Sequence, residues 1–155
     1  MFPGEVTGYL ETRDLDAIDL EGTRRIVVIA PWQIERTRGS ADLLWNSASF
    51  QEMEPEIVEN YARLLSPRIR KYIYLKEAPE GKEIAGKRGE VGVLERTMAS
   101  DYERFFGDFV LRTRDKCVHV TCTNPHAVPH LSLDMHDQML FERSVGGASN
   151  GLAAS

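Results

Sequence analysis

The stretch DLLWNSASFQEMEPEIVENY, residues 42–61, sets a short apolar run against a cluster of polar side chains and then continues into a helical pattern. DLLWN, residues 42–46, is typical of a short strand. Apolar residues recur at helical spacing after Pro55, which suits the first turn of a helix. A second apolar run, YIYL at residues 72–75, follows. This order of strand, helix and strand predicts a parallel βαβ unit and therefore an α/β fold.

The remaining segments extend this pattern in both directions. RIVVIA, residues 25–30, is a continuous apolar run that ends before Pro31, and it predicts a strand buried on both faces. Residues 76–98 are rich in Gly, Lys and Glu, which predicts a mobile loop near the carboxyl ends of the strands. FVLRT at 109–113 and QMLFER at 138–143 predict an antiparallel pair of strands at the sheet edge.

Composition fits one domain with a core of its own. The chain has 155 residues, of which 42% are hydrophobic and 28% are charged. We expect a domain at residues 25–143, a poorly anchored segment at 1–24 and a disordered tail at 144–155. The net charge of -5 provides no basic surface, which argues against nucleic-acid binding. The sequence shows neither a membrane span nor a signal peptide, so a cytoplasmic location is expected.

A polar cluster follows the strand expected at residues 42–46. Asn46, Ser47, Gln51 and Glu52 lie just past its carboxyl end, where open α/β sheets bind their ligands. These residues are therefore candidates for a binding or catalytic site. The alternative is local: Ser47 and a neighbouring serine cap the helix, and Glu52 completes a capping box.

Several motifs occur together in this chain. They are PWQIE at 31–35, NSASFQEM at 46–53, EIVENY at 56–61, YIYL at 72–75 and HDQMLFER at 136–143. With these motifs, residues 25–78 resemble the sugar O-methyltransferases, a branch of the class I S-adenosylmethionine-dependent methyltransferases. The rest of the chain resembles that family more loosely.

The resemblance implies a partial Rossmann-like sheet. In the family the strand order is 3-2-1-4-5-7-6, and residues 25–30, 42–46 and 72–75 would be strands 3, 4 and 5. The Gly-rich turn after strand 1 and the acidic residue after strand 2, which bind the cofactor, do not occur in this sequence. The chain would thus correspond to the C-terminal half of the domain, with strands 1 and 2 missing.

The resemblance also implies a cofactor, S-adenosylmethionine. Pro31, Trp32 and Gln33 would lie beside its adenine, with Trp32 as a flat apolar wall and the Gln33 amide as a hydrogen-bonding group. The alternative for Trp32 is that it belongs to the ordinary core.

On the acceptor side, Asn46 and Ser47 would face the methyl group, and Gln51 and Glu52 would line the same opening. The acceptor would be a sugar or another hydroxylated small molecule, and no metal would be required. The alternative function is a non-catalytic, truncated module that acts through a partner or through self-association at an exposed strand edge.

Cysteines and histidines near the C-terminus give weaker indications. Cys117, His119, Cys122 and His126 lie close together, but their spacing matches no usual zinc site, so we predict no metal centre. Either His130 or His136 is a candidate general base for a sugar hydroxyl. The alternative is an exposed loop histidine without a role.

Overall fold

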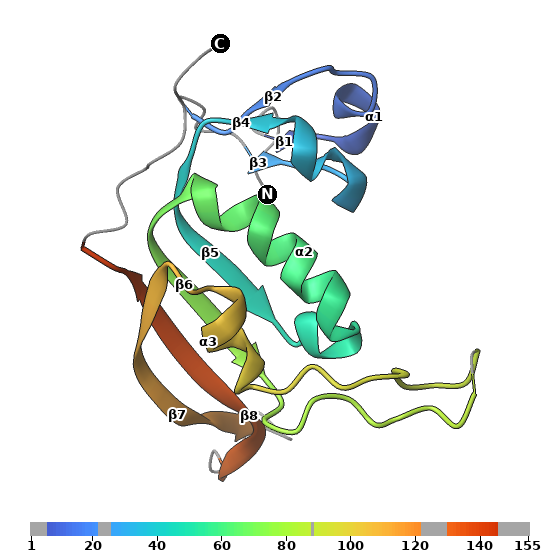
Figure 1. The fold of residues 1–155 in the computed structure, drawn as a ribbon, viewed down its shortest axis with the longest axis vertical. Helices are drawn as coiled ribbons and strands as arrows, with labels where there is room; N and C mark the ends of the chain where they lie inside the picture. Colours follow the sequence, from blue (N-terminus) through green and yellow to red (C-terminus); the bar gives the residue numbers. More distant parts are fainter. Residues whose placement is uncertain (1–5, 22–25, 88, 122–129, 146–155) are drawn as a thin grey trace.

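A mixed sheet forms the centre of the computed structural model, which describes residues 6–21, 26–87, 89–121 and 130–145. The sheet is four-stranded and has the order β5-β6-β8-β7 (Figure 1). Its strands are β5 (Ala41–Ser47), β6 (Ile69–Glu77), β7 (Phe109–Thr121) and β8 (His130–Arg143). β5 and β6 are parallel, and β8 is antiparallel to β6 and β7. The predicted α/β fold is confirmed, and the strand order agrees with the 4-5-7-6 part of the order that the resemblance implies.

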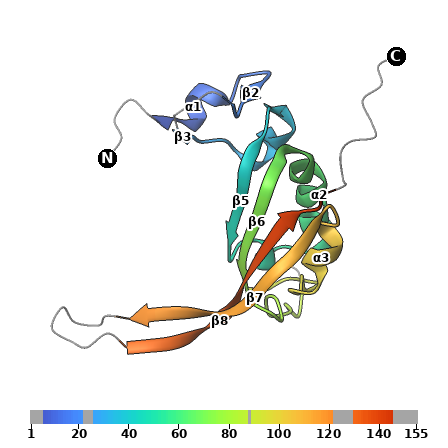
Figure 2. The same ribbon diagram turned by 90° about the vertical axis from the view of Figure 1, so that its left-hand side faces the viewer.

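The predicted βαβ unit is also confirmed. β5 leads through the short 3₁₀ helix η2 (Phe50–Glu52) to α2 (Pro55–Leu65), and η3 (Ser66–Arg68) returns the chain to β6. Val58 and Ala62 are fully buried, because they lie on the face of α2 that packs on the sheet. The later helix α3 (Asp101–Phe105) covers the same face, so no helix of the described residues covers the other face of the sheet (Figure 2).

Aromatic rings fill the space between these helices and the sheet. The ring centroid of Phe50 lies 6.2 Å from that of Tyr61, 6.3 Å from that of Tyr102 and 6.4 Å from that of Phe106. Phe141 on β8 contacts Phe106 from the sheet side, with 6.4 Å between the centroids. Through these ring contacts, η2, which begins at Phe50, packs against α2, α3 and the sheet.

The prediction of a buried strand at residues 25–30 is wrong. Only β3 (Ile26–Val27) forms there, and it pairs with β1 (Val6–Thr7) outside the main sheet. The side chains of Ile26 and Val28 are 51% and 45% exposed. An apolar run becomes a buried central strand only where long strands flank it on both sides, and the described part of the chain places no such neighbours beside β3.

Short elements make up the rest of the N-terminal part. They are α1 (Tyr9–Thr12), β2 (Ile18–Asp19), η1 (Pro31–Arg36) and β4 (Thr37–Arg38), and β2 pairs with β4 in parallel. Of the expected unanchored and disordered ends, residues 1–5, 22–25 and 146–155 lie outside the described residues. How firmly residues 6–21 are held stays a prediction.

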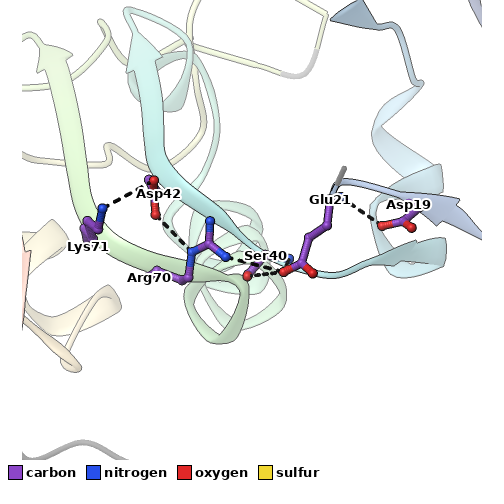
Figure 3. A network of polar contacts seen from close by, with 6 residues as sticks. All are labelled: Asp19, Glu21, Ser40, Asp42, Arg70 and Lys71. Atoms are coloured by element: carbon purple, nitrogen blue, oxygen red, sulfur yellow. Dashed lines mark hydrogen bonds and ion pairs between the residues drawn. The ribbon is translucent and has the colours of Figure 1, made fainter. Parts of the chain in front are cut away.

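Polar contacts connect the β2–β4 pair to the beginnings of β5 and β6 (Figure 3). Glu21 accepts hydrogen bonds from the Ser40 hydroxyl at 2.6 Å and from Arg70 at 3.5 Å. Arg70 also donates to Asp42 at 2.9 Å, and Lys71 lies 3.4 Å from the same carboxylate. The charged side chains in these contacts are about half exposed, so solvent screens their ion pairs. The contacts therefore contribute more to the orientation of the β2–β4 pair against β5 and β6 than to the stability of the fold.

The segment between β6 and α3 is a loop, as the sequence predicts. Among its described residues the only β-bridge joins Ile84 to Val93. Gly81 and Gly92 have positive φ angles of 67° and 127°, and a Cβ atom at either would lie 2.5 Å from a backbone oxygen. The hairpin of β7 and β8 extends well beyond the rest of the sheet (Figure 2). None of the described helices is long and apolar enough to cross a membrane.

Candidate functional site

A mostly apolar groove of about 370 Å³ opens between the start of η1, the carboxyl end of β5 and one side of α2. Pro31 and Ile34 line it from the η1 side, Leu44 and Asn46 from β5, and Tyr61 from α2. The groove therefore brings Pro31, from the predicted cofactor side, together with Asn46, from the predicted acceptor side. A second hollow of about 380 Å³ adjoins it and shares the side chains of Pro31 and Tyr61.

Trp32 lines this second hollow rather than the core. Its side chain is 69% exposed and meets the ring of Tyr9 edge to face, with 6.1 Å between the centroids and a 90° angle between the planes. The alternative that Trp32 is ordinary core is therefore wrong. A flat apolar surface is available to a ligand at this position.

Gln33 is placed differently from its neighbours, because it is completely buried. Its amide nitrogen donates to the carbonyl oxygen of Thr12 at 2.8 Å, and its amide oxygen accepts from the backbone N–H of Ala30 at 2.8 Å. The side chain thus joins η1 to α1. A role for Gln33 in binding adenine stays a prediction, and it would require these bonds to break.

The turn after β5 has its own hydrogen bonds. Ala48 adopts a left-handed conformation with φ of 56°, which redirects the chain into η2. Asn46 donates from its amide to the Ser49 hydroxyl at 2.6 Å and accepts from the backbone N–H of Phe50 at 3.3 Å. The predicted capping box is wrong, because the N-cap residue of α2 is Glu54, which forms no side-chain cap.

We expect Asn46→Ala to lower the free energy of unfolding by about 1 kcal/mol, because both bonds within the turn are lost. Asn46→Asp keeps the oxygen that accepts from Phe50, so it is the matched control and should lose less. Urea unfolding of the two variants measures the difference. Equal stability of Asn46→Ala and the unmodified chain would show that the turn does not depend on this side chain.

Ser47 and Glu52 lie at the ends of this turn. Ser47 is exposed at the last position of β5. Glu52 forms an ion pair of 3.0 Å with Lys82 in the loop after β6. Neither lines the groove described above, so the predicted acceptor residues are adjacent in the chain without converging on one point in the structure.

Next to the turn lies a buried carboxyl group, Glu77, at the last position of β6. It is fully buried, and one of its oxygens accepts the backbone N–H of Gln51 at 3.1 Å. Its other oxygen has no hydrogen-bond partner among the described residues, and the same holds for the hydroxyl of Tyr102. Burial raises the pKa of Glu77 to about 7, although the N–H of Gln51 favours its charged form. Burial and the charge of Glu77 raise the pKa of Tyr102.

Gln51 connects this carboxyl group to His136. The amide nitrogen of Gln51 lies 3.5 Å from Nε2 of His136, which belongs to β8. The alternative of an exposed loop histidine is therefore wrong, because His136 is half-buried within a strand. The structure thus brings a predicted acceptor residue and a predicted base together beside Glu77.

Asp137 pairs with Glu77 across the two strands. Burial opposes ionisation of Asp137, but hydrogen bonds from Lys116 and Arg114 outweigh it and lower the pKa of this carboxyl group. Arg114 donates at 2.8 Å, and the Lys116 ammonium lies at 2.6 Å. Two adjacent carboxyl groups therefore differ in their tendency to hold a proton, because burial dominates at Glu77, whereas hydrogen bonds from Arg114 and Lys116 dominate at Asp137.

Glu77 was not among the site residues expected from the sequence, although the pattern of β6 indicates its position. Ile73 and Leu75 are buried, and side chains two residues apart in a strand lie on the same face. Glu77 continues this series and is therefore expected on the core side of β6. A charged residue at the end of a buried series is a candidate for a perturbed pKa.

Within the described residues, no group of His, Cys, Asp and Glu side chains is arranged to hold a metal ion. Of the cysteines and histidines weighed as a zinc site, Cys122 and His126 lie outside the described residues.

No protein-family model and no curated protein sequence matches this chain. Similar solved structures include TehB from Haemophilus influenzae, with a TM-score of 0.49 and 8% identity over 80% of this chain and 43% of that chain. Magnesium protoporphyrin IX methyltransferase from Synechocystis PCC 6803, with bound SAH, gives a TM-score of 0.48 and 12% identity over 87% and 57%. A protein of echinomycin biosynthesis gives 0.47 and 13% over 82% and 59%. The chain spans about half the length of each of these proteins.

Proposed function

We propose that this chain is the acceptor-side half of an S-adenosylmethionine-dependent methyltransferase that modifies a hydroxyl group of a sugar or a similar small molecule. The observation that carries the proposal is the sheet: two parallel strands are followed by an antiparallel strand, β8, inserted between β6 and β7. The resemblance at residues 25–78 implies this order, and strands that lie far apart in the sequence form it here.

The groove offers part of what the cofactor needs. Its apolar walls, with Pro31, Leu44 and Tyr61, suit a planar base, and Asn46 places an amide at the end of β5. Among the described residues that line it, none carries a charge, so the groove supplies no carboxylate for ribose hydroxyls and no cation for a carboxylate. The residues that line the groove therefore fit only the adenine end of S-adenosylmethionine. In this proposal, another segment provides the remaining contacts, and this chain orients the acceptor.

We expect the 155-residue chain by itself to bind S-adenosylmethionine weakly or not at all. Micromolar affinity corresponds to about 8 kcal/mol of binding free energy, which the uncharged groove should not provide. Isothermal titration calorimetry of the purified chain measures this directly. Saturable micromolar binding would contradict the expectation that half of the pocket is absent.

A longer chain provides the test of the function itself. Extending the reading frame upstream of Met1 should add a strand, a Gly-rich turn and an acidic residue, and the extended protein should bind the cofactor in the same titration. Absence of such a segment, or absence of binding by the extended protein, would overturn the proposal.

A second candidate function is a non-catalytic module that acts through its own association or through a partner. One observation favours it: β5 ends the sheet and has a neighbouring strand on one side only within the described part of the chain. Unpaired backbone groups along such an edge can pair with another strand.

A further inference from the structure

The side of β5 that faces away from β6 is an ordered row of backbone hydrogen-bonding groups. At the end of the strand, the N–H of Ala48 donates to the carbonyl oxygen of Lys76 on β6 at 2.7 Å. Backbone groups alternate between the two sides of a strand, so those of Leu43, Trp45 and Ser47 point away from β6. We call these outward groups the open edge. No other strand of the described chain pairs with them.

Large apolar side chains accompany the open edge. Trp45 is 65% exposed, and Leu43 is about half exposed. Leu44 between them packs against the core, so both lie on the opposite face of β5, which no described helix covers. There the ring of Trp45 packs against Tyr74 with 4.5 Å between the centroids. In the register of β5 and β6, Leu43 lies beside Tyr72, which is also partly exposed. An apolar patch therefore continues from the edge strand onto its neighbour.

The devices that usually protect an edge strand are missing along most of this one. Edge strands commonly carry lysine, proline or a bulge that prevents pairing. β5 contains neither lysine nor proline, and its only irregularity lies at its beginning, between Ala41 and Leu43. Asp42 is its only charged residue, and Arg70 and Lys71 pair with that carboxylate.

We propose that the open edge binds the same edge of a second copy of this chain, in antiparallel orientation, with the two Trp45 residues directly opposite each other. In this register Leu43 of one copy pairs with Ser47 of the other, so every outward N–H and C=O group obtains a partner. Asp42 lies opposite Ala48, so the two carboxylates do not face each other. The Trp45 rings meet across the strands on the face without helices, and the two sheets become one.

This inference rests on the open edge of β5 and does not depend on methyl transfer. In the longer protein of the proposed function a further strand would occupy the open edge, so the dimer is expected of the 155-residue chain and not of that longer protein. Cofactor binding by the longer protein and dimer formation by the 155-residue chain are measured separately, so the failure of one is distinguishable from the failure of the other.

Sedimentation velocity of the purified chain over a range of concentrations tests the dimer. In Trp45→Lys two ammonium groups would lie opposite each other, and the dissociation constant should rise by about tenfold or more. The matched control is Trp32→Lys, because Trp32 is similarly exposed, at 69%, but lies in η1 away from the open edge. That variant should sediment like the unmodified chain.

Hydrogen exchange on the unmodified chain supplies a second measurement that needs no variant. The amides of Leu43, Trp45 and Ser47 should become more protected as the protein concentration rises, whereas that of Leu44, which faces β6, should not change. A monomer at all concentrations with rapidly exchanging amides at the open edge overturns the proposal. So does a dimer that Trp45→Lys leaves intact, because its interface would lie elsewhere.

Discussion

Replacing Phe50 with alanine is expected to lower the free energy of unfolding by about 3–5 kcal/mol. Phe50 is only 4% exposed, and its ring lies within 6.4 Å, between centroids, of Tyr61, Tyr102 and Phe106. Removing it leaves a cavity at the junction of η2, α2 and α3. The surrounding rings are held by separate helices, so they can close the cavity only in part.

The effect should reach the candidate site, because Phe50 begins the helix that carries Gln51. The backbone N–H of Gln51 is bonded to Glu77, so its amide should exchange faster in Phe50→Ala than in the unmodified chain. Phe50→Leu is the control, since it keeps most of the volume and should lose less than about 1.5 kcal/mol. Urea unfolding gives the free energies. A loss below about 1 kcal/mol in Phe50→Ala would mean that the ring does not support the core in the way described.

The raised pKa of Glu77 should make the folded chain less stable as the pH rises. The pKa of this carboxyl group is raised from 4.5 in the unfolded chain to about 7 in the folded one. Between these values the folded protein keeps a proton that the unfolded chain has lost, so stability is fully present below pH 4.5 and declines up to about pH 7. With allowance for solvent screening, we expect a decline of about 2 kcal/mol.

Glu77→Gln isolates this contribution, because glutamine cannot lose a proton but can still accept the N–H of Gln51. The variant and the unmodified chain should have similar stability near pH 5, and the variant should be more stable by about 2 kcal/mol near pH 8. Urea unfolding at both pH values measures the difference, in which the titration of other groups cancels. A difference that does not change with pH would show that Glu77 is already ionised in the folded protein.

Both predictions concern the polar turn that follows β5. Phe50 fixes η2 from the core side, and Glu77 fixes the backbone of Gln51 from the end of β6. Gln51 in turn lies beside His136. If the proposed methyl transfer is correct, the geometry of this turn would position the acceptor. Phe50→Ala would also change the wall of the groove, which Phe50 lines, whereas Glu77→Gln would alter the turn and leave the residues that line the groove unchanged.

The sequence by itself determined the elements whose pattern is local. The helix at Pro55–Leu65 follows from its apolar spacing and its initial proline, and the strands around it follow from short apolar runs. The antiparallel pair near the C-terminus was also predictable, although β7 and β8 are longer than the motifs at 109–113 and 138–143. The resemblance to the sugar O-methyltransferases added the order in which these strands assemble.

Only the tertiary structure decided which apolar run is buried and which polar residues meet. RIVVIA has the composition of a central strand, but burial depends on flanking strands, and the described chain leaves Ile26 and Val28 largely exposed. Conversely, Glu77 is fully buried at the end of β6, where it pairs with Asp137 on β8 and accepts the backbone N–H of Gln51 in η2. Glu77 and His136 both lie beside Gln51, although they are 26 and 85 positions away from it in the chain. No local pattern encodes such distances, because they depend on how strands remote in sequence pair.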